Sequence, residues 1–283
     1  GKVTNSGFDL MLSYADRSGD FTWGASLIAS YASNRIDYMA EIVTIASRAQ
    51  TGRAIGSVFG YEADGFYDVT DFDADGNLRS DLPFVTLAKV QPGDIKYKDR
   101  NKDSVIDTQD EKFIGNSTLP KFNASLTLSF GYKGFDFSVL LQGTAGRNVN
   151  LLDAPLQNIA FRDNGNVFGI AENRWAYYPE QGIDTRADAS YPRLSLLDNN
   201  NNYQNSTLWM RDGDFLKVRN IELGYTLPAR ALRAMKMSDL RIFVRGLNLF
   251  TFSPLMNELG VDPEVLSGHP ALKSYNVGIN LTF

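Results

Sequence analysis

Apolar and polar residues alternate strictly along several stretches of the chain. The alternation is clearest in 122–132 and recurs in 8–14, 21–31, 135–141, 221–227, 240–250 and 275–283. A period of two residues is typical of a β-strand with one apolar and one polar face. Within 240–250 the phase changes at the letters GLNLF, which predicts a β-bulge or the strand's exit from its sheet. The pattern therefore predicts an all-β fold.

The segments between these strands differ sharply in length. Two are tight turns, at 16–20 and 132–136, and one of middle length, 227–239, is expected to hold a helical turn or two. The others are long and rich in Asn, Asp, Gly and aromatic residues: 37–121, 145–210 and 252–270. The run DNNNNYQN (198–205) is predicted to be a polar loop tip. Short turns that alternate with long loops are typical of an outer-membrane β-barrel.

Alternation alone leaves two architectures open. A soluble β-sandwich turns its apolar face inward, whereas a membrane barrel turns it outward to lipid. The polar positions in these strands are mostly Asn, Ser, Thr and Gly with an occasional Arg. Small uncharged side chains suit a hydrated barrel lumen, so this composition favours the barrel without excluding the sandwich.

The composition excludes several classes of protein. The 283 residues carry a net charge of -5, and the pI near 5.0 argues against a nucleic-acid-binding protein. Cysteine is absent and His269 is the single histidine, so the chain has no disulfide, no thiolate zinc site and no site built on several histidines. No apolar run approaches the roughly 20 residues of a transmembrane helix. We expect no enzymatic activity.

Six segments together resemble one known family. In chain order they are GSVFGYEADGFYD (56–68), PGDIKYKDRNKDSVIDTQDEKFIGNSTLPKF (92–122), YKGFDFSVLLQG (132–143), FLKVRNIELGYTLP (215–228), LRIFVRGLNLFTFS (240–253) and SYNVGINLTF (274–283). They resemble the C-terminal portion of the SusC/RagA family of TonB-dependent outer-membrane transporters of the Bacteroidetes. Each segment is a weak signal, but six in order are specific, and they extend over nearly the whole chain.

The resemblance implies a fold, a function and partners. The fold would be part of a large antiparallel transmembrane β-barrel, 22-stranded in the family, with about seven to nine strands in this chain. Residues 1–283 would form the C-terminal portion of the receptor, with the plug and the first barrel strands outside this chain. The function implied is nutrient uptake: import of oligosaccharides or peptides under a SusD-like lipoprotein lid, driven by TonB through the N-terminal part.

The resemblance also gives a role to the last strand. Outer-membrane barrels end on a strand of alternating apolar residues that finishes on an aromatic residue, and the barrel assembly machinery uses it as an insertion signal. The residues at these positions are Tyr275, Val277, Ile279, Leu281 and Phe283. The alternative is a chain end that falls within a strand by chance. Strand parity then places the C-terminus in the periplasm and the long loops outside the cell, in the outer membrane of a Gram-negative, Bacteroidetes-like bacterium.

The letters DRNKDSVIDTQD have the spacing of an EF-hand-type calcium loop. Oxygen ligands fall at positions 1, 3, 5, 7, 9 and 12, which are Asp99, Asn101, Asp103, Val105 (by its carbonyl), Asp107 and Asp110. Ser104 replaces the usual Gly at the sharp turn, and Asp110 replaces the bidentate Glu, so weak Ca²⁺ binding in an extracellular loop is expected. The alternative is a hydrated turn whose Asp and Asn side chains bind their own backbone.

Aromatic residues in the loop 145–210 are candidates for contact with a substrate or with the lid. They are Trp175, Tyr177, Tyr178, Tyr191, Tyr203 and Trp209. Aromatic faces beside Asn and Asp suit stacking on a sugar or docking of a peptide, and the alternative is that they pack the loop itself. A different function also stays open, that of a soluble, secreted, calcium-stabilised β-sandwich that binds glycans.

Overall fold

The computed structural model describes residues 1–153, 167–196, 199–235, 237–266 and 268–283. They form two compact units. The first, here called the loop unit, comprises Gly1–Thr4, Asn34–Thr118 and Asn148–Asp212. The second, the sheet unit, comprises Asn5–Ser33, Leu119–Arg147 and Gly213–Phe283.

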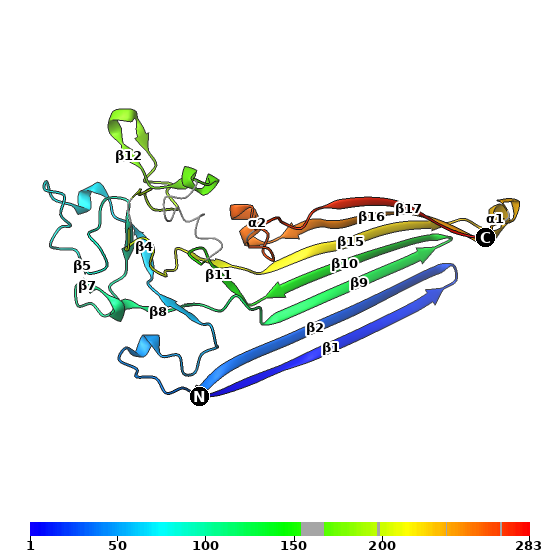
Figure 1. Cartoon of the computed structure of the whole chain (residues 1–283), viewed down its shortest axis with the longest axis horizontal. Coiled ribbons are helices and arrows are strands. Elements are labelled where there is room, and N and C mark those ends of the chain that lie inside the picture. Colours follow the sequence, from blue (N-terminus) through cyan, green and yellow to red (C-terminus); the bar gives the residue numbers. More distant parts are fainter. Residues whose placement is uncertain (154–166, 197–198, 236, 267) are drawn as a thin grey trace. The chain divides into compact units, whose positions relative to one another are not determined.

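The sheet unit is built on one seven-stranded sheet (Figure 1). Its order is β1-β2-β9-β10-β15-β16-β17, and neighbouring strands run antiparallel. The strands are β1 (Lys2–Ser18), β2 (Phe21–Tyr38), β9 (Phe122–Tyr132), β10 (Phe135–Ala145), β15 (Phe215–Thr226), β16 (Asp239–Phe252) and β17 (Ser274–Thr282). Each coincides with one of the seven alternating stretches to within a few residues, so the all-β prediction is confirmed. The described part of 37–121 adds no further strand to this sheet.

The register aligns the apolar positions of neighbouring strands into rows. One row runs through Trp23, Phe130, Phe137, Leu223, Val244 and Val277. A second runs through Phe21, Tyr132, Phe135, Tyr225, Ile242 and Ile279. Most of these large apolar side chains are exposed. A continuous apolar face on this scale is atypical of a soluble surface and is suited to an apolar solvent.

A β-bulge lies where the alternation changes phase. Val218 pairs with Phe250 and Asn220 pairs with Leu247, so one residue of β15 faces two of β16. Asn248, one of those two, has a φ of 52°, in the left-handed region that Asn tolerates better than most residues. The prediction of a bulge at GLNLF is confirmed, and β16 continues beyond it to Phe252.

Charged side chains cross-link three strands on the polar face. Arg241 donates to the carboxylates of Asp136 and Glu222, and Arg245 donates to Glu222. The Phe243 ring lies between these two arginines and against Gly278, where a Cβ would come within 2.3 Å of the ring. These ion pairs lie on the polar face of the sheet. Because they join oppositely charged side chains of different strands, they fix the register of β10, β15 and β16.

The connections leave the two ends of the sheet in two classes. At one end lie the turns β1–β2 and β9–β10 and the segment that holds helix α1 (Ala229–Met235). At the other end lie the three long connections, of which the last holds helix α2 (Pro254–Leu259). The predicted alternation of short and long connections is confirmed. No helix in the described residues is long and apolar enough to cross a membrane.

A buried lysine holds the α2 connection to the sheet. Lys217 on β15 is 1% exposed, and its Nζ lies 2.6 Å from Asp262 and 2.7 Å from Glu264. Arg219 beside it also bonds Glu264 and donates to Gln142 on β10. Burying a charged ammonium group is costly unless it is paired with carboxylates. Lys217 can therefore be buried here only because Asp262 and Glu264 neutralise it.

The loop unit consists of short strands and 3₁₀ turns. Its paired strands are β3 (Val58–Gly60) with β8 (Lys112–Gly115), β4 (Ala63–Phe66) with β6 (Ile95–Tyr97), β5 (Phe84–Val85) with β7 (Val105–Ile106), β11 (Asn148–Asn150) with β14 (Met210–Asp212), and β12 (Tyr177–Tyr178) with β13 (Ile183–Asp184). The 3₁₀ turns are η1 (Ala46–Arg48), η2 (Val69–Asp71), η3 (Thr108–Asp110), η4 (Gly169–Asn173) and η5 (Pro179–Gln181). Buried aromatic and aliphatic side chains form its core, among them Tyr61, Tyr67, Ile95, Leu151 and Trp209.

A buried carboxylate organises this unit. Asp94 is fully buried, and one of its oxygens accepts hydrogen bonds from Arg193 (2.7 Å), Asn199 (2.8 Å) and Asn202 (3.0 Å). Asn201, also buried, donates to the backbone of Ile95. The prediction that 198–205 is a polar loop tip is therefore wrong for the described residues 199, 201 and 202. The amides of Asn199 and Asn202 satisfy a buried charge, and that of Asn201 satisfies a backbone carbonyl. A sequence pattern does not distinguish these roles from those of a hydrated loop.

We expect Asp94→Ala to lower the free energy of unfolding of the loop unit by about 3–5 kcal/mol, because it leaves the Arg193 guanidinium and two amides without their acceptor. Hydrogen exchange, resolved by segment, would show lost protection in 91–97 and 199–209. Asp75→Ala, a change to an exposed carboxylate of the same unit, is the control and should leave protection unchanged. Equal protection in both variants would contradict this role for Asp94.

Candidate functional site

The predicted calcium loop lies between β6 and β8. The Asp99 carboxylate accepts from the backbone N–H groups of Lys102 (2.6 Å) and Ser104 (2.8 Å). Asp110 is fully buried and accepts from the backbone of Arg100 (2.7 Å) and Asp107 (3.0 Å). These bonds fold the segment into a compact loop through its own acids.

Two residues of this loop have left-handed backbone. Lys102 has a φ of 62° and Ser104 a φ of 66°, so Ser104 makes the turn for which an EF-hand-type loop uses Gly. Asn101 and Asp103 bond each other, and Asp103 also accepts from the Val105 N–H. Among the described residues, no group of three or more His, Cys, Asp or Glu side chains is arranged to hold a metal ion. Calcium at Asp99, Asn101, Asp103, Val105, Asp107 and Asp110 stays a prediction.

An ion pair closes the ends of the same loop. Glu62 bonds Lys98, which precedes the loop, at 2.6 Å, and Lys112, which follows it. Bonds from Lys112 and then Lys98 lower the pKa of Glu62 to about 2 from its usual 4.5. Because the pKa is lowered in the folded state, this stabilisation is present above pH 4.5 and is lost as the pH falls toward 2.

The six predicted contact aromatics fall into three groups. Trp209 is 0% exposed, and Trp175 and Tyr191 are also buried. These three pack the interior of the loop unit, so in this structure they have no free face for a sugar or a peptide. Tyr203 is half-buried, with its ring 6.5 Å from that of Trp209. The alternative given by the sequence, that aromatics pack the loop, holds for the buried three.

The remaining two aromatics lie on the hairpin β12–β13. Tyr178 is 50% exposed, and the Arg186 guanidinium lies 3.8 Å from the centre of the Tyr177 ring. Arg186 also bonds Asp184 and Asp68, and these bonds raise its pKa further above its usual value. The hairpin therefore presents one tyrosine on a rigid base, and contact with a substrate or lid stays a prediction for Tyr177, Tyr178 and Tyr203.

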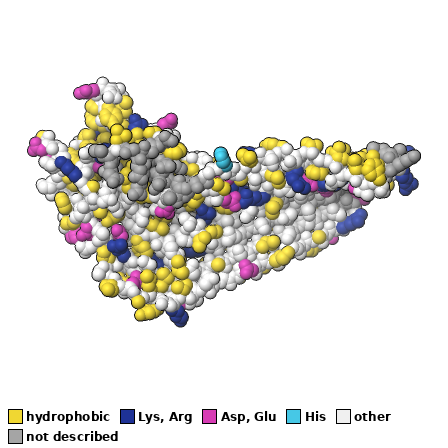
Figure 2. Space-filling model, viewed as in Figure 1, with side chains coloured by type: hydrophobic (Ala, Val, Ile, Leu, Met, Phe, Trp, Pro, Cys, Tyr) yellow, Lys and Arg dark blue, Asp and Glu magenta, His cyan; other side chains and the backbone are white. Residues whose placement is uncertain are grey.

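The predicted insertion signal lies along β17. Its apolar residues Tyr275, Val277, Ile279, Leu281 and Phe283 are between 48% and 83% exposed. Figure 2 shows hydrophobic side chains at the surface along this strand. One edge of β17 pairs with β16, and no other described strand pairs with its second edge. An apolar strand with a free edge has the form of a site for strand addition.

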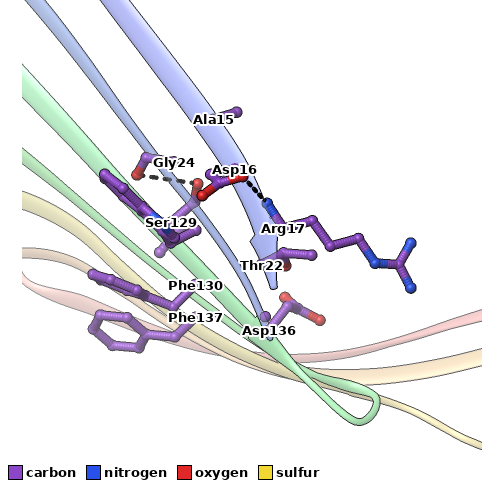
Figure 3. A pocket seen from close by; sticks show the side chains of 12 residues that line it. Ala15, Asp16, Arg17, Thr22, Gly24, Ser129, Phe130, Asp136 and Phe137 are labelled. Carbon is purple, nitrogen blue, oxygen red and sulfur yellow. Dashed lines mark hydrogen bonds between the residues drawn. The ribbon is translucent and has the colours of Figure 1, made fainter. Parts of the chain in front are cut away.

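Small side chains leave a hollow on the polar face of β1, β2, β9 and β10. It has a volume of about 680 Å³, and Thr22, Gly24, Ser129, Gly131 and Ser138 are among its lining residues. In Figure 3 the rings of Phe130 and Phe137 lie side by side and extend away from Asp136. The sheet therefore has a shallow, hydrated face suited to water or to another part of the protein.

Sequence reasoning placed arginines at polar positions of the strands but missed their carboxylate partners on this face. Arg241 lies 105 residues from its partner Asp136, and Glu222 lies between them in the chain. The usable signal was their parity: each occupies a polar position of an alternating stretch. Parity predicts the face, but pairing across strands needs the register, which the sequence alone does not provide.

The comparisons with known proteins extend along the whole chain. A scan against models of protein families finds none that matches. TonB-dependent receptor P3 of Formosa agariphila is 23% identical over 315 residues, with 100% of this chain and 29% of that protein covered. TonB-dependent receptor P39 of the same organism is 24% identical, with 94% and 28% covered. The chain resembles TonB-dependent receptors over its full length. It spans less than a third of these relatives.

Solved structures agree in fold. The RagAB peptide transporter superposes with a TM-score of 0.65 at 18% identity, covering 99% of this chain and 29% of that one. The RagAB peptide importer in its open-open state gives 0.63 at 19% identity, with 99% and 29% covered. The predicted fold class, part of a large antiparallel β-barrel, is confirmed by this likeness. The relatives are named as receptors and importers, in agreement with the prediction that the chain is not an enzyme.

We expect Ca²⁺ to bind the 99–110 loop with a Kd between micromolar and millimolar, since carboxylate and carbonyl oxygens at this spacing are calcium ligands. Calorimetric titration of chelator-treated protein measures it, and at a hundredfold excess over Kd the unfolding free energy should rise by about 2.7 kcal/mol. Asp103→Asn should weaken binding, whereas Asp73→Asn, in the separate turn 71–77, should not. If no heat of binding is observed, or if Asp103→Asn leaves it unchanged, the calcium prediction is wrong. The loop is then a turn stabilised by its own hydrogen bonds.

Proposed function

We propose that this chain is part of an outer-membrane, TonB-dependent importer of oligosaccharides or peptides. One observation carries the proposal: a single antiparallel sheet with continuous exposed apolar rows, in a chain that resembles TonB-dependent receptors over its full length. In lipid an exposed apolar face is stable, because the hydrocarbon takes the place of a protein core.

The same observation argues against the soluble β-sandwich. A sandwich buries its apolar face under a second sheet, whereas Leu223, Val244 and Val277 stand exposed on neighbouring strands of this one. The 3₁₀ turns and two-stranded ladders of the loop unit form no extended sheet among the described residues. The alternative function, a soluble glycan-binding module, therefore lacks the fold that it needs.

The rest of the barrel belongs to the proposal. β1 and β17 are the outer strands of the sheet, and an unpaired strand edge is not tolerated in hydrocarbon. We infer that further strands of the receptor pair with both edges and close the barrel. The coverage of 29% of the relatives' length supports this arrangement.

The partners follow from the same family resemblance. A SusD-like lipoprotein would close over the long loops as a lid, as the two-component name RagAB of the structural relatives supports. TonB would act through the N-terminal part of the receptor. The short turns and the C-terminus would lie in the periplasm and the long connections outside the cell, so that the loop unit meets the substrate first.

Fractionation of native cells tests the importer directly. We expect the species with this C-terminus in the outer-membrane fraction, and its intact mass should be about three to four times the 31.4 kDa of this chain, in line with the coverage of the relatives. A soluble or secreted protein of 31.4 kDa would overturn the proposal. Loss of growth on one polymer after deletion of the gene would then identify the nutrient.

A matched pair of arginine substitutions tests which face meets lipid. Leu223→Arg places a charge on the apolar face of β15 and should cost about 2–4 kcal/mol in the membrane, lowering the assembled amount in the outer membrane. Ser138→Arg places the same charge on the polar face of β10, opposite Glu222, and should assemble normally. Normal assembly of Leu223→Arg would show that this face does not contact lipid.

The terminal aromatic has its own prediction. We expect Phe283→Ala to reduce outer-membrane insertion, because the last side chain of the apolar row on β17 would be lost from the signal used by the assembly machinery. Quantitative immunoblotting of the outer-membrane fraction measures the effect. Asn280→Ala, a change on the opposite face of the same strand, should insert as the native protein does; equal insertion of both variants would exclude a signal at Phe283.

A further inference from the structure

The loop unit holds a polar cavity, and Tyr203 is the one predicted contact aromatic among its lining residues. Its volume is about 580 Å³, within the range of small-molecule sites. Five separate segments of the unit line it, and the residues are Arg48, Ser57, Val58, Phe59, Gly60, Tyr61, Glu111, Asn150, Asp153, Tyr203, Gln204 and Asn205. Three amide side chains, two carboxylates and one guanidinium are concentrated there, with the rings of Phe59 and Tyr203 beside them.

Part of this lining is fixed by bonds within the protein. Glu111 lies 3.1 Å from the Arg48 Nε, and its backbone carbonyl accepts from Ser47. Burial raises the pKa of Glu111, and Arg48 and a hydrogen bond from Tyr61 partly offset the shift. Asn150 donates to Asn205 at 2.9 Å and accepts from the Leu152 N–H. The cavity wall is therefore held in place before any ligand arrives.

Other groups on the wall keep unused bonding capacity toward the cavity. The Arg48 guanidinium is committed at Nε only, so its terminal N–H groups have no partner among the described residues. The Asp153 carboxylate likewise has no described side-chain partner. Gln204 uses its amide nitrogen on Asn200, and its Oε1 accepts no hydrogen bond from the part of the chain that the structure describes. The wall thus offers donors and acceptors at the same time.

We propose that this cavity binds a neutral oligosaccharide. The inference rests on the proposed importer and narrows its substrate class from oligosaccharide or peptide to oligosaccharide. A sugar hydroxyl donates and accepts at once, so it satisfies a wall that mixes the Arg48 donors with the Asp153 and Gln204 acceptors. The half-buried Tyr203 ring gives an apolar surface for the C–H face of a pyranose.

Charge and polarity argue against the other ligand classes. Two carboxylates against one guanidinium give the wall a net charge of -1, which disfavours acidic sugars and other anions. A peptide would need apolar pockets for its side chains or a free strand edge. Next to the end of β3, the backbone of Tyr61 already pairs with the segment 205–206, through the bond from its N–H to the Asn205 carbonyl and the bridge to Ser206, so a peptide finds no open strand edge at Tyr61.

Calorimetry on the full-length receptor in detergent tests the site. The probes are neutral cello-, malto- and xylo-hexaoses, an oligogalacturonate of the same length, and a mixture of tryptic peptides. We expect one neutral series to bind, and Asp153→Ala to weaken it about tenfold, since a bond to a charged group is lost. Asp75→Ala, the same change at an exposed site outside the cavity, should bind as the native protein does. Equal thermal unfolding of both variants confirms that the fold is intact.

The possible results distinguish failure of the cavity proposal from failure of the importer proposal. Neutral sugar binding that is insensitive to Asp153→Ala overturns the cavity and leaves the importer standing. Binding of peptides or of the oligogalacturonate that depends on Asp153 overturns the ligand class, and binding of none of the probes overturns the site. A 31.4 kDa soluble protein that binds a neutral hexaose through Asp153 would contradict the importer proposal and support the proposed sugar site.

Discussion

The structure depends on one constraint: a single-layer sheet with an apolar face is stable only where that face meets an apolar medium. The backbone of the seven strands is satisfied by hydrogen bonds between neighbours, but the apolar rows of side chains have no covering layer within the sheet unit. In water their exposure would oppose folding. In hydrocarbon the same rows can form the outer surface. The remaining requirement concerns the strand edges, because unpaired backbone groups are not tolerated there and both edges must be hydrogen-bonded. The proposed membrane location and the proposed further strands both rest on this constraint.

Specificity is then carried by the other face. Apolar side chains in lipid gain little from one particular neighbour, so they tolerate a slip in register. Ion pairs do not tolerate such a slip, because Arg241 reaches both Asp136 and Glu222 only in the observed register of the three strands. Lys217, buried on the polar face, plays the same role for the α2 connection. The charges are few, and each determines how segments distant in sequence pair.

The sheet was predictable from the sequence and the loop unit was not, for a physical reason. Strands with two distinct faces carry a period of two, and a bulge shifts that period, so the ends of β9 and the bulge near Asn248 could both be predicted from the letters. The loop unit has short elements without a period. Asn199 and Asn202 are buried because Asp94, more than a hundred residues earlier, needs donors, and Asn201 donates to the backbone carbonyl of Ile95. Trp209 is likewise core and not surface. Polar composition indicates contact with water only when no buried charge requires the same groups.

Buried amides around Asp94 and free polar groups around the 580 Å³ cavity are two uses of the same residue types in one unit. Where Asn199 and Asn202 meet the buried charge, both the oxygen and the nitrogen of each amide are bonded. Where they line the cavity, bonds such as that from Asn150 to Asn205 fix the wall, while Arg48 and Asp153 keep capacity for a ligand. A site that binds hydroxyl groups must be rigid and incompletely bonded at once. The loop unit achieves this by placing incompletely bonded side chains beside fully bonded ones. The hydrogen bonds that stabilise the fold then also orient the groups that would bind the sugar.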